Sequence, residues 1–385
     1  LLTRILKQYG ALKDILSNVL SLDYLGGLAG SLLFPILLYP LMGRMLTSLV
    51  IGAVNIAIAL LIIIKISYNN KKKYDILVPL ISLIVLITLS VNSNIFTNII
   101  KKRYYDDVIF SKRSKYQEIL LTRSDDDFRL FLDGALQFSS YDEHRYHEML
   151  IFPVLALTRA QKKQVLLLGG GDGLAVRELL KDPTVAGITV IELDGEIIKL
   201  AKTNSSLKRL NQNALLNPKV TIFVQDAYHY LMNSNKKYDI IIADFPDPHD
   251  ETIAKLYTIE FYMMVRRALH NDGFFVTQST SPYFATKAFW CIHKTLSAVF
   301  PTVTPYHIYI PSFGDWGFNI AGKRKYILHK KTYSFKPVKY FSKNSFFNAL
   351  YFTKDIKKVP TKINNFNRPL LYQYYLEGWK HKVEN

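Results

Sequence analysis

VLLLGGGDG, at residues 165–173, is the stretch that decides the fold of this chain. An apolar run leads directly into glycines, which is typical of a buried strand followed by a loop whose backbone can approach a ligand closely. Four more apolar runs follow, each separated from the next by a helical pattern: ITVIELD (188–194), VTIFVQDA (220–227), YDIIIADFPDP (238–248) and GFFVTQST (273–280). This alternation predicts an α/β domain over residues 163–325, with a doubly wound parallel sheet covered by helices on both faces.

A different pattern precedes this domain, over residues 105–162. The short runs YQEILLT (116–122), FRLFLDG (128–134) and ALQFS (135–139) are separated by polar residues and by Gly134. Such spacing predicts a small antiparallel sheet. Beyond the α/β domain, residues 326–385 are rich in Lys, Asn, Phe and Tyr without clear periodicity, and we interpret them as a basic, aromatic C-terminal tail with no assigned chemistry.

The N-terminal part of the chain is apolar. Residues 24–43, 46–64 and 76–91 carry no charged side chain, and each approaches the length of about 20 residues that crosses a bilayer as a helix. A buried core helix normally keeps a polar stripe, which these segments lack. We therefore expect about three transmembrane helices within residues 24–100, preceded by an amphipathic or loop segment at 1–23.

Charge and composition narrow the function classes. The 385 residues carry a net charge of +18 and are 49% hydrophobic, which excludes a disordered chain. Cys291 is the single cysteine, so an intrachain disulfide framework and a multi-thiolate metal site are excluded. Basic residues at 71–73 and 101–103 flank the same apolar segment, so the positive-inside rule does not fix a topology. Because the first residue is Leu1, we expect a fragment or a processed form.

The carboxyl ends of the predicted parallel strands are where a doubly wound sheet binds its ligand. Gly169 and Gly171 begin a GxGxG pattern, and Leu174 prevents a match to the dinucleotide pattern GxGxxG. The form that remains is typical of proteins that bind a nucleoside sulfonium. Glu192 follows the glycines by about 20 residues, where an acidic side chain can accept both ribose hydroxyls.

The third strand ends in Asp226 and Ala227, which could bind an adenine through the carboxylate and a backbone amide. Asp at a strand-to-helix junction is also common as a plain helix N-cap. Both interpretations of Asp226 stay open on the sequence.

The fourth strand end carries two acids on a proline-stiffened loop, Asp244 and Asp247 in ADFPDP. Asp172 follows the neighbouring strand, so the predicted cleft gathers negative charge in a basic protein. That distribution indicates a cationic small ligand and argues against a nucleic acid. The plainer alternative is a solvated acidic turn.

Taken in order, these motifs resemble a known family. YQEI, FLDGALQFSSYDEHRYHEML, GGGDG, VIELD, QDAYHYL, ADFPDP and KLYTIEFY resemble the spermidine synthase family of polyamine aminopropyltransferases, over residues 105–325. The apolar segments and IPSFGDWGF are similar to its membrane-bound bacterial subgroup. The resemblance implies a Rossmann-like domain and transfer of an aminopropyl group from decarboxylated S-adenosylmethionine to putrescine or a related amine, with release of methylthioadenosine.

The resemblance also implies roles for single residues. The nucleoside or donor would be bound by Gln117, Gly169, Gly171, Asp172, Glu192, Asp226 and Ala227, and the polyamine by Tyr146, His147, Asp172, Asp244 and Asp247. Asp244 would be the proton acceptor. No metal and no prosthetic group are expected, and the donor is a co-substrate. A homodimer formed through the small sheet and a multi-pass protein of the cell (inner) membrane, with a cytoplasmic catalytic domain, are further expectations.

The chemistry of the residues agrees with these roles, because an ammonium near pKa 10 must lose a proton before it can attack, and a carboxylate within reach can take that proton. One departure is Phe313, which stands where the family has a tyrosine and so removes a hydroxyl from the amine pocket. Two alternatives remain. An S-adenosylmethionine-dependent methyltransferase would use the same glycine loop, and a non-catalytic polyamine-binding membrane protein would use the same acids.

Overall fold

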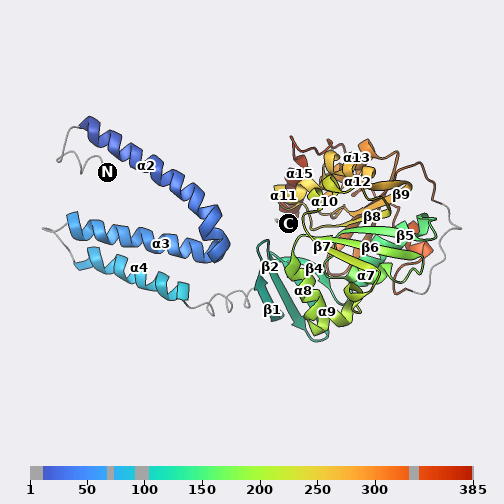
Figure 1. The fold of residues 1–385 in the computed structure, drawn as a ribbon, viewed down its shortest axis with the longest axis horizontal. Coiled ribbons are helices and arrows are strands. Elements are labelled where there is room, and N and C mark those ends of the chain that lie inside the picture. Colours follow the sequence, from blue (N-terminus) through green and yellow to red (C-terminus); the bar gives the residue numbers. More distant parts are fainter. Residues whose placement is uncertain (1–11, 67–72, 92–103, 329–337, 384–385) are drawn as a thin grey trace. The chain divides into compact units, whose positions relative to one another are not determined.

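The structure is a computed structural model that describes residues 12–66, 73–91, 104–328 and 338–383. The chain divides into two compact units, Leu1–Tyr105 and Asp106–Asn385. Figure 1 shows the helices of the first unit and the mixed α/β architecture of the second.

The N-terminal unit is helical. Its described elements are α2 (Leu12–Leu33), the π-helical turn η1 (Phe34–Leu38), α3 (Tyr39–Ile66) and α4 (Lys73–Val91). The Thr47 hydroxyl donates to the Leu38 carbonyl at 3.1 Å, whereas nine residues of straight helix would separate these positions by about 13 Å. The chain therefore turns back sharply in the first turns of α3, as Figure 1 shows.

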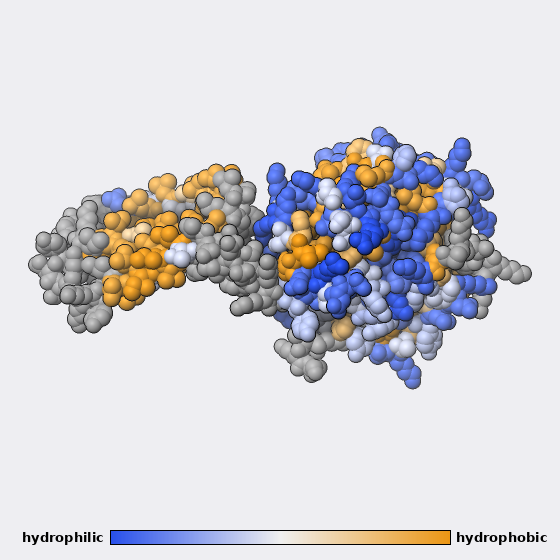
Figure 2. Space-filling model, turned by 90° about the horizontal axis from the view of Figure 1, so that it is seen from below, coloured by the Kyte–Doolittle hydropathy of each residue, from blue (hydrophilic) through white to orange (hydrophobic). Residues whose placement is uncertain are grey.

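Two of these helices are long and apolar enough to cross a membrane, by length and composition. The qualifying stretches are Ser17–Leu38 and Leu46–Ile63, while the apolar stretch of α4 is shorter, Leu77–Thr88. Many of their described apolar side chains are exposed: Ile36 is 71% exposed and Leu22 is 70% exposed. Figure 2 shows the resulting hydrophobic surface. A surface of this kind indicates contact with lipid or with other apolar partners.

The second unit begins with the predicted small sheet. Its strands are β1 (Asp107–Arg113), β2 (Glu118–Ser124), β3 (Asp127–Leu132) and β4 (Ala135–Ser139), antiparallel in the order β1-β2-β3-β4. Asp133 and Gly134 connect β3 to β4 with φ of 47° and 83°, a pair of left-handed residues that suits a tight hairpin turn. The antiparallel sheet is confirmed, and β1 is an additional strand that lies outside the predicted runs.

The large sheet contains the five predicted parallel strands. They are β5 (Lys163–Gly169), β6 (Val185–Glu192), β7 (Val220–Val224), β8 (Tyr238–Asp244) and β9 (Leu269–Gln278), followed by β10 (Thr302–Ile310) and β11 (Gly314–Gly322). The strand order is β10-β11-β9-β8-β5-β6-β7, with β11 antiparallel to both of its neighbours. The chain leaves β5 toward β6 on one side and returns to β8 on the other, so the switch point of this doubly wound sheet lies at the end of β5.

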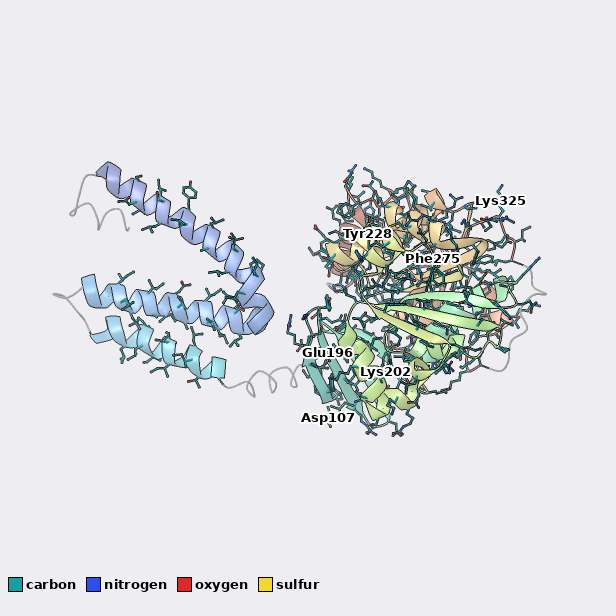
Figure 3. The ribbon with its side chains drawn as sticks, viewed as in Figure 1. Asp107, Glu196, Lys202, Tyr228, Phe275 and Lys325 are labelled. Atoms are coloured by element: carbon teal, nitrogen blue, oxygen red, sulfur yellow. The ribbon has the colours of Figure 1, made fainter. Side chains whose placement is uncertain are left out.

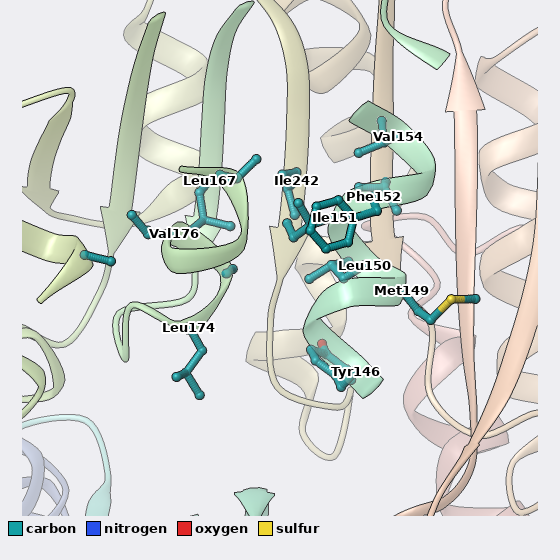
Figure 4. Packing of buried hydrophobic residues seen from close by; sticks show 14 of the residues in the cluster. Tyr146, Met149, Leu150, Ile151, Phe152, Val154, Leu167, Leu174, Val176 and Ile242 are labelled. Carbon is teal, nitrogen blue, oxygen red and sulfur yellow. The ribbon is translucent and has the colours of Figure 1, made fainter. Parts of the chain in front are cut away.

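Helices cover both faces of the sheet, as predicted. They are α6 (Glu143–Leu157), α7 (Leu174–Leu179), α8 (Gly195–Thr203), α9 (Ser205–Leu210), η2 (Ala214–Leu216), α10 (Ala227–Asn233), α11 (Glu251–Ala254), η3 (Lys255–Tyr257), α12 (Ile259–Ala268), α13 (Thr286–Val299), α14 (Lys343–Asn348) and α15 (Leu370–Val383). Alternate residues of β5 point to opposite faces: Leu167 joins the core with α6 and α7, whereas Leu166 and Leu168 join the core with α12 and α13. Figure 4 shows the first core, in which Ile151 of α6 lies beside Ile242, while Tyr146 lies farther along the same helix.

The C-terminal residues do not stand apart from this domain. Leu371 of α15 is fully buried in the second core. The indole N–H of Trp290 donates to the Ile356 carbonyl at 3.0 Å, and the Asn364 side chain donates to the carbonyls of Ala254 and Tyr257. Our interpretation of residues 326–385 as a tail is therefore corrected for 338–383, whose irregular stretches lack periodicity because they pack through backbone hydrogen bonds.

Candidate active site

The glycine loop after β5 is shaped by two close approaches. A Cβ at Gly169, whose φ is +82°, would lie 2.2 Å from the Asp244 carbonyl oxygen. A Cβ at Gly171 would lie 2.7 Å from the Glu192 side chain. These glycines therefore let the ends of β5, β6 and β8 come together, which brings their carboxylates to one edge of the sheet.

Glu192 ends β6 and is held by backbone amides. Its Oε2 accepts from the Gly171 N–H at 3.1 Å and its Oε1 from the Asp194 N–H at 3.0 Å. Withdrawal from water raises the pKa of Glu192 to about 7, helped by the charges of Asp172 and Asp194 and opposed by the two N–H donors. The two N–H donors thus fix the direction of the Glu192 carboxylate.

The small sheet contributes Gln117 to the same end of the molecule. Its side-chain amide donates to Asp194 Oδ2 at 3.0 Å, and the Ser114 hydroxyl donates to the same oxygen at 2.6 Å. Lys112 of β1 forms an ion pair with Glu196 at 2.6 Å, and Figure 3 labels Glu196 on α8 beside the small sheet. Asp194 is a residue without a predicted role that joins Gln117 to the Glu192 strand end.

Asp226 lies apart from the other acids. It is exposed at the end of the edge strand β7, and its Oδ1 caps α10 by accepting from the His229 N–H at 2.8 Å. The adjacent Ala227 is buried. The N-cap interpretation of Asp226 is therefore confirmed, and its contact with an adenine stays a prediction.

Asp244, at the end of β8, is paired with Tyr146. The phenol donates to Asp244 Oδ1 at 2.6 Å, so α6 delivers a hydroxyl directly to the predicted proton acceptor. Burial raises the pKa of Asp244, while the charge of His147 and the hydrogen bond from Tyr146 oppose the rise. Burial and the Asp244 charge raise the pKa of Tyr146 well above its usual value, so the phenol keeps its proton and remains the donor.

His147 places a positive charge beside the acidic group, which consists of Asp172, Asp244 and Asp247. Its Nδ1 contacts Glu143 Oε2 at 2.8 Å, and Glu143 in turn accepts two hydrogen bonds from Arg177 at 2.9 Å each. Burial alone would lower the pKa of His147, but the hydrogen bond to Glu143 and the charges of Glu143, Asp172 and Asp244 outweigh it and raise the pKa to about 9. The imidazolium therefore stabilises the charged forms of Asp172 and Asp244.

Asp172 follows the glycine loop. Its Oδ1 accepts from the Leu174 N–H at 2.8 Å at the start of α7. Burial and the charges of Asp244 and Glu143 raise the pKa of Asp172 to about 6, against the opposing charge of His147. The carboxylate is near enough to Asp244 for the two to repel each other, and a bound cation would relieve that repulsion.

Asp247 forms the far end of the acidic group. Its Oδ2 accepts from the Thr280 hydroxyl at 3.1 Å, while no close donor reaches the buried Oδ1 among the described residues. Burial raises the pKa of Asp247 to about 6, opposed by Thr280, Tyr375 and His249. A buried oxygen without a close donor is a favourable position for an ammonium hydrogen.

Thr280 reaches Asp247 from a strained backbone. Its φ is +59°, a left-handed conformation that a β-branched residue rarely adopts. The Gln278 side chain accepts from the Thr280 N–H at 2.8 Å, and the Gly317 N–H donates to the Thr280 carbonyl at 2.9 Å. Strain retained in this way is typical of a functional position.

The loop that carries both aspartates is tied to its neighbours. The Gln278 side chain donates to the Phe245 carbonyl at 2.8 Å and to the Tyr257 hydroxyl at 2.6 Å. Tyr257 donates to the Pro246 carbonyl at 3.1 Å. Thr280 and Gln278 could have been found from the sequence, because Gln278 ends the fifth strand and Thr280 follows it.

The acidic group has the chemistry of a site for a small cation. The structure brings together Tyr146, His147, Asp172 and Asp244, and Glu192 on the glycine-loop side. Phe313 lies beside Tyr146, with ring centroids 6.4 Å apart, so the predicted loss of a hydroxyl concerns the wall of this site. Among the residues that the structure describes, no group of three or more His, Cys, Asp or Glu side chains is arranged to hold a metal ion.

Comparisons with known proteins give one consistent family. Residues 143–334 match the model of the spermine/spermidine synthase domain. The chain is 39% identical to a polyamine aminopropyltransferase of Leptospira interrogans serogroup Icterohaemorrhagiae serovar copenhageni, over 98% of this chain and 76% of the relative. It is 35% identical to polyamine aminopropyltransferase 2 of Ralstonia nicotianae, over 95% of this chain and 73% of the relative.

Solved structures agree with that result. A spermidine synthase in complex with the transition-state analogue AdoDATO is similar with a TM-score of 0.60 and 29% identity, over 64% of this chain and 85% of that chain. A spermidine synthase from Thermotoga maritima is similar with a TM-score of 0.58 and 29% identity, over 64% and 84%.

Proposed function

This chain belongs to the spermine/spermidine synthase family and acts as a polyamine aminopropyltransferase, and from that premise we propose its substrates and the roles of its residues. The donor is decarboxylated S-adenosylmethionine, and the acceptor is putrescine or a related amine. The site needs no prosthetic group for this transfer, because the donor is a sulfonium and methylthioadenosine leaves it as a neutral thioether.

The observation that carries this proposal is the pair Asp244 and Tyr146. A buried carboxylate that accepts a phenol hydrogen bond at 2.6 Å is fixed in direction, and its raised pKa makes it a stronger base than an exposed aspartate. Its second oxygen can take a proton from an ammonium. The acceptor nitrogen thereby gains the lone pair with which it attacks.

The transfer itself is a single displacement. The nitrogen lone pair forms a C–N bond to the methylene carbon next to the sulfonium, the C–S bond breaks, and its electron pair goes to sulfur. Methylthioadenosine leaves as a neutral thioether, and Asp244 holds the proton lost by the amine. Holding both substrates in line supplies much of the rate, because it replaces a bimolecular encounter.

The donor occupies the glycine-loop side in this proposal. Glu192 accepts the ribose hydroxyls, Asp226 and Ala227 contact the adenine, and Gln117 closes the nucleoside from the small sheet. Asp172 pairs with the ammonium of the aminopropyl arm. Binding of the cationic donor is supported by the pKa of Asp172, because a group raised to about 6 by burial and like charges gains most from a positive partner.

The acceptor occupies the Asp247 side in this proposal, next to Tyr146 and His147. Asp247 receives the second ammonium of a diamine while Asp244 receives the proton of the first. The spacing of the two carboxylates, three positions apart on one loop, suits a ligand with an amine at each end.

The test is methylthioadenosine release by the full chain in detergent. Decarboxylated S-adenosylmethionine is supplied with putrescine, cadaverine, spermidine or agmatine, and S-adenosylmethionine is the control donor. Release with one amine supports the proposed substrates and names the acceptor. Methyl transfer from the control donor, or amine binding without release from any pair, would overturn the proposal.

Membrane attachment and assembly extend the proposal. The exposed apolar helices support a multi-pass protein of the cell (inner) membrane, and the cytosolic origin of the donor supports a cytoplasmic catalytic unit. Family resemblance supports a homodimer formed through the small sheet. Retention of the chain in membranes after alkaline extraction tests the first point, and the mass of the detergent-solubilised particle tests the last.

A further inference from the structure

The helix α6 begins at an aspartate whose carboxylate bonds to a distant segment. Asp142 occupies the N-cap position of α6, yet its side chain accepts no hydrogen bond from residues 143–146, all of which the structure describes. The N-cap carboxylates of Asp194, Asp226 and Asp250 each accept from an N–H of the helix that they begin. Asp142 is 3% exposed, and a carboxylate buried to this extent needs donors from elsewhere in the fold.

The donors come from the turn between β10 and β11. Asp142 Oδ2 accepts from the Ser312 N–H at 2.7 Å, and its Oδ1 accepts from the Ser312 hydroxyl at 2.8 Å. Arg145, in the first turn of α6, adds a hydrogen bond from its Nη1 to the Tyr309 carbonyl at 2.7 Å. Hydrogen bonds to a charged group are stronger than those between neutral groups, so the Asp142–Ser312 contact holds this turn on α6.

The turn has a fixed shape of its own. The Phe313 N–H donates to the Ile310 carbonyl at 3.0 Å, and Gly314 follows with φ of +81°. This is the pattern of a short hairpin turn closed by a left-handed residue. Phe313 is therefore placed by the shape of the turn, and the turn is placed by the Asp142–Ser312 contact.

The other side of the turn rests on Phe284, in the segment before α13. A Cβ at Gly314 would lie 2.9 Å from the Phe284 ring, on which Trp379 of α15 stacks with ring centroids 4.9 Å apart. A Cβ at Gly378 would lie 2.6 Å from the Phe284 carbonyl oxygen, so α15 also touches the backbone there. The Asp142–Ser312 contact thus presses the turn against a support that is itself well packed.

Phe313 lies beside the tyrosine that bonds to the proposed proton acceptor. Its ring meets Tyr146 edge to face, with centroids 6.4 Å apart and planes inclined by 70°. The Tyr146 hydroxyl donates to Asp244 Oδ1 at 2.6 Å. The contacts therefore run from Asp142 through Ser312 and Phe313 back to α6, at the residue that meets Asp244.

We propose that Asp142 is a positioning residue for the amine acceptor, which through Ser312 holds Phe313 against Tyr146 and so sets how long a diamine the pocket admits. The inference rests on the proposed function. Phe313 has no hydroxyl with which to bind an amine, so it distinguishes diamines of different length by its position. A ring held at one position disfavours a longer chain, because a packed site accommodates one more methylene only at a cost.

The first experiment compares Ser312→Ala with Ser312→Thr in the full chain in detergent. The alanine variant removes the hydroxyl that bonds to Asp142 Oδ1 and keeps the N–H, whereas the threonine variant keeps both donors. We expect Ser312→Ala to raise kcat/KM for cadaverine relative to putrescine about fivefold, with the donor KM unchanged, because one of two hydrogen bonds to a charged group is lost. Ser312→Thr should keep the wild-type ratio.

The ratio between the two diamines separates positioning from general damage. A variant that only destabilises the fold lowers activity with both amines alike and leaves their ratio unchanged. Asp142→Asn keeps the size of the side chain and removes its charge, so it should shift the ratio in the same direction as Ser312→Ala. An unchanged ratio in Ser312→Ala, or an equal rise in the KM of donor and amine, would overturn the inference even if Asp142→Asn fails to fold.

A double-mutant cycle tests whether the contact acts through Phe313. In a Phe313→Ala background the ring is already absent, so Ser312→Ala should produce no further change in the ratio of cadaverine to putrescine. A full additional shift would overturn the inference, because the contact would then act by another route. If the wild type releases no methylthioadenosine with any amine, the proposed function fails, and the dissociation constants of the two diamines for the same variants decide the role of Asp142.

Discussion

The two halves of the site hold their carboxylates in different ways. On the half that we propose for the nucleoside, Glu192 and Asp226 accept hydrogen bonds from backbone N–H groups. On the half that we propose for the amine, Asp244 and Asp247 are held by side-chain hydroxyls from Tyr146 and Thr280, which are far from them in the chain. The first half is held by backbone donors, and the second by side-chain donors.

This difference shows where substrate preference can change. Backbone donors persist when side chains are substituted, so the nucleoside half tolerates little variation in what it binds. Hydroxyl donors can be removed or moved one at a time, so the amine half can adapt to acceptors of different length. Substitutions should therefore affect one substrate at a time, and kinetic measurements on single variants can test that separation.

Asp244→Asn should have the largest effect and should fall entirely on chemistry. Without a proton acceptor, kcat should drop by about 10²–10⁴, because general-base catalysis supplies an acceleration of that order. Methylthioadenosine should still bind to the variant with nearly wild-type affinity in calorimetry. Full activity would remove Asp244 from the mechanism, and loss of nucleoside binding would mean that the two halves are not separate.

Glu192→Ala should affect the other half. The donor KM should rise roughly tenfold to a hundredfold, as expected when hydrogen bonds to a charged group are lost, while the KM for putrescine stays the same. Steady-state kinetics with each substrate varied in turn provides the measurement. An unchanged donor KM would refute the ribose role of Glu192.

Thr280→Val should produce a smaller, opposite pattern. The variant keeps the shape of the side chain and removes the donor to Asp247 Oδ2, so the KM for putrescine should rise about fivefold with the donor KM unchanged. Thr280→Ser is the matched control, because it keeps the hydroxyl and should remain close to the wild type. If the serine variant is as weak as the valine variant, the hydroxyl is not what matters.

The smallest effect should be on stability, and it concerns both halves together. The pKa values of Asp172, Asp247 and Glu192 are raised to about 6, 6 and 7, so these acids bind protons more tightly in the folded state than in the unfolded state. This tighter binding stabilises the folded state at low pH, and the stabilisation is lost as pH rises through those values. His147, raised to about 9, loses its contribution as pH rises from 6.5 to 9. The free energy of unfolding should therefore fall between pH 5 and pH 9, by on the order of 1 kcal/mol or more.

Denaturant unfolding at several pH values measures that slope. Putrescine should flatten it, because a bound dication removes the repulsion among the acids. Glu192→Gln should flatten it as well, between pH 5 and pH 7. Stability that rises with pH over this range would contradict the burial of these charges.

The sequence could predict the half of the site that depends on local order. VLLLGGGDG and VIELD contain both a strand and the residues after it, so the residue order alone places Gly171 and Glu192 at one sheet edge. Asp244 and Asp247 could be found by the same rule. The confirmed parallel strands follow from the same periodicity.

The missed features depend on contacts between distant segments. Nothing local in residues 338–383 predicts their packing, because Leu371 is buried and Asn364 is hydrogen-bonded only through contacts with segments far away in the chain. Asp226 was ambiguous for a different reason, since one carboxylate can cap a helix and still bind a ligand. Its role on the nucleoside remains a prediction.

Gly378 limits how relatives of this chain can diverge. Any side chain there meets the backbone of Phe284 and Ala285, so a lineage that replaces this glycine must shift its last helix. That shift would disturb the stacking of Trp379 on Phe284, whose ring centroids lie 4.9 Å apart. Among relatives, positions 284, 378 and 379 should therefore change together.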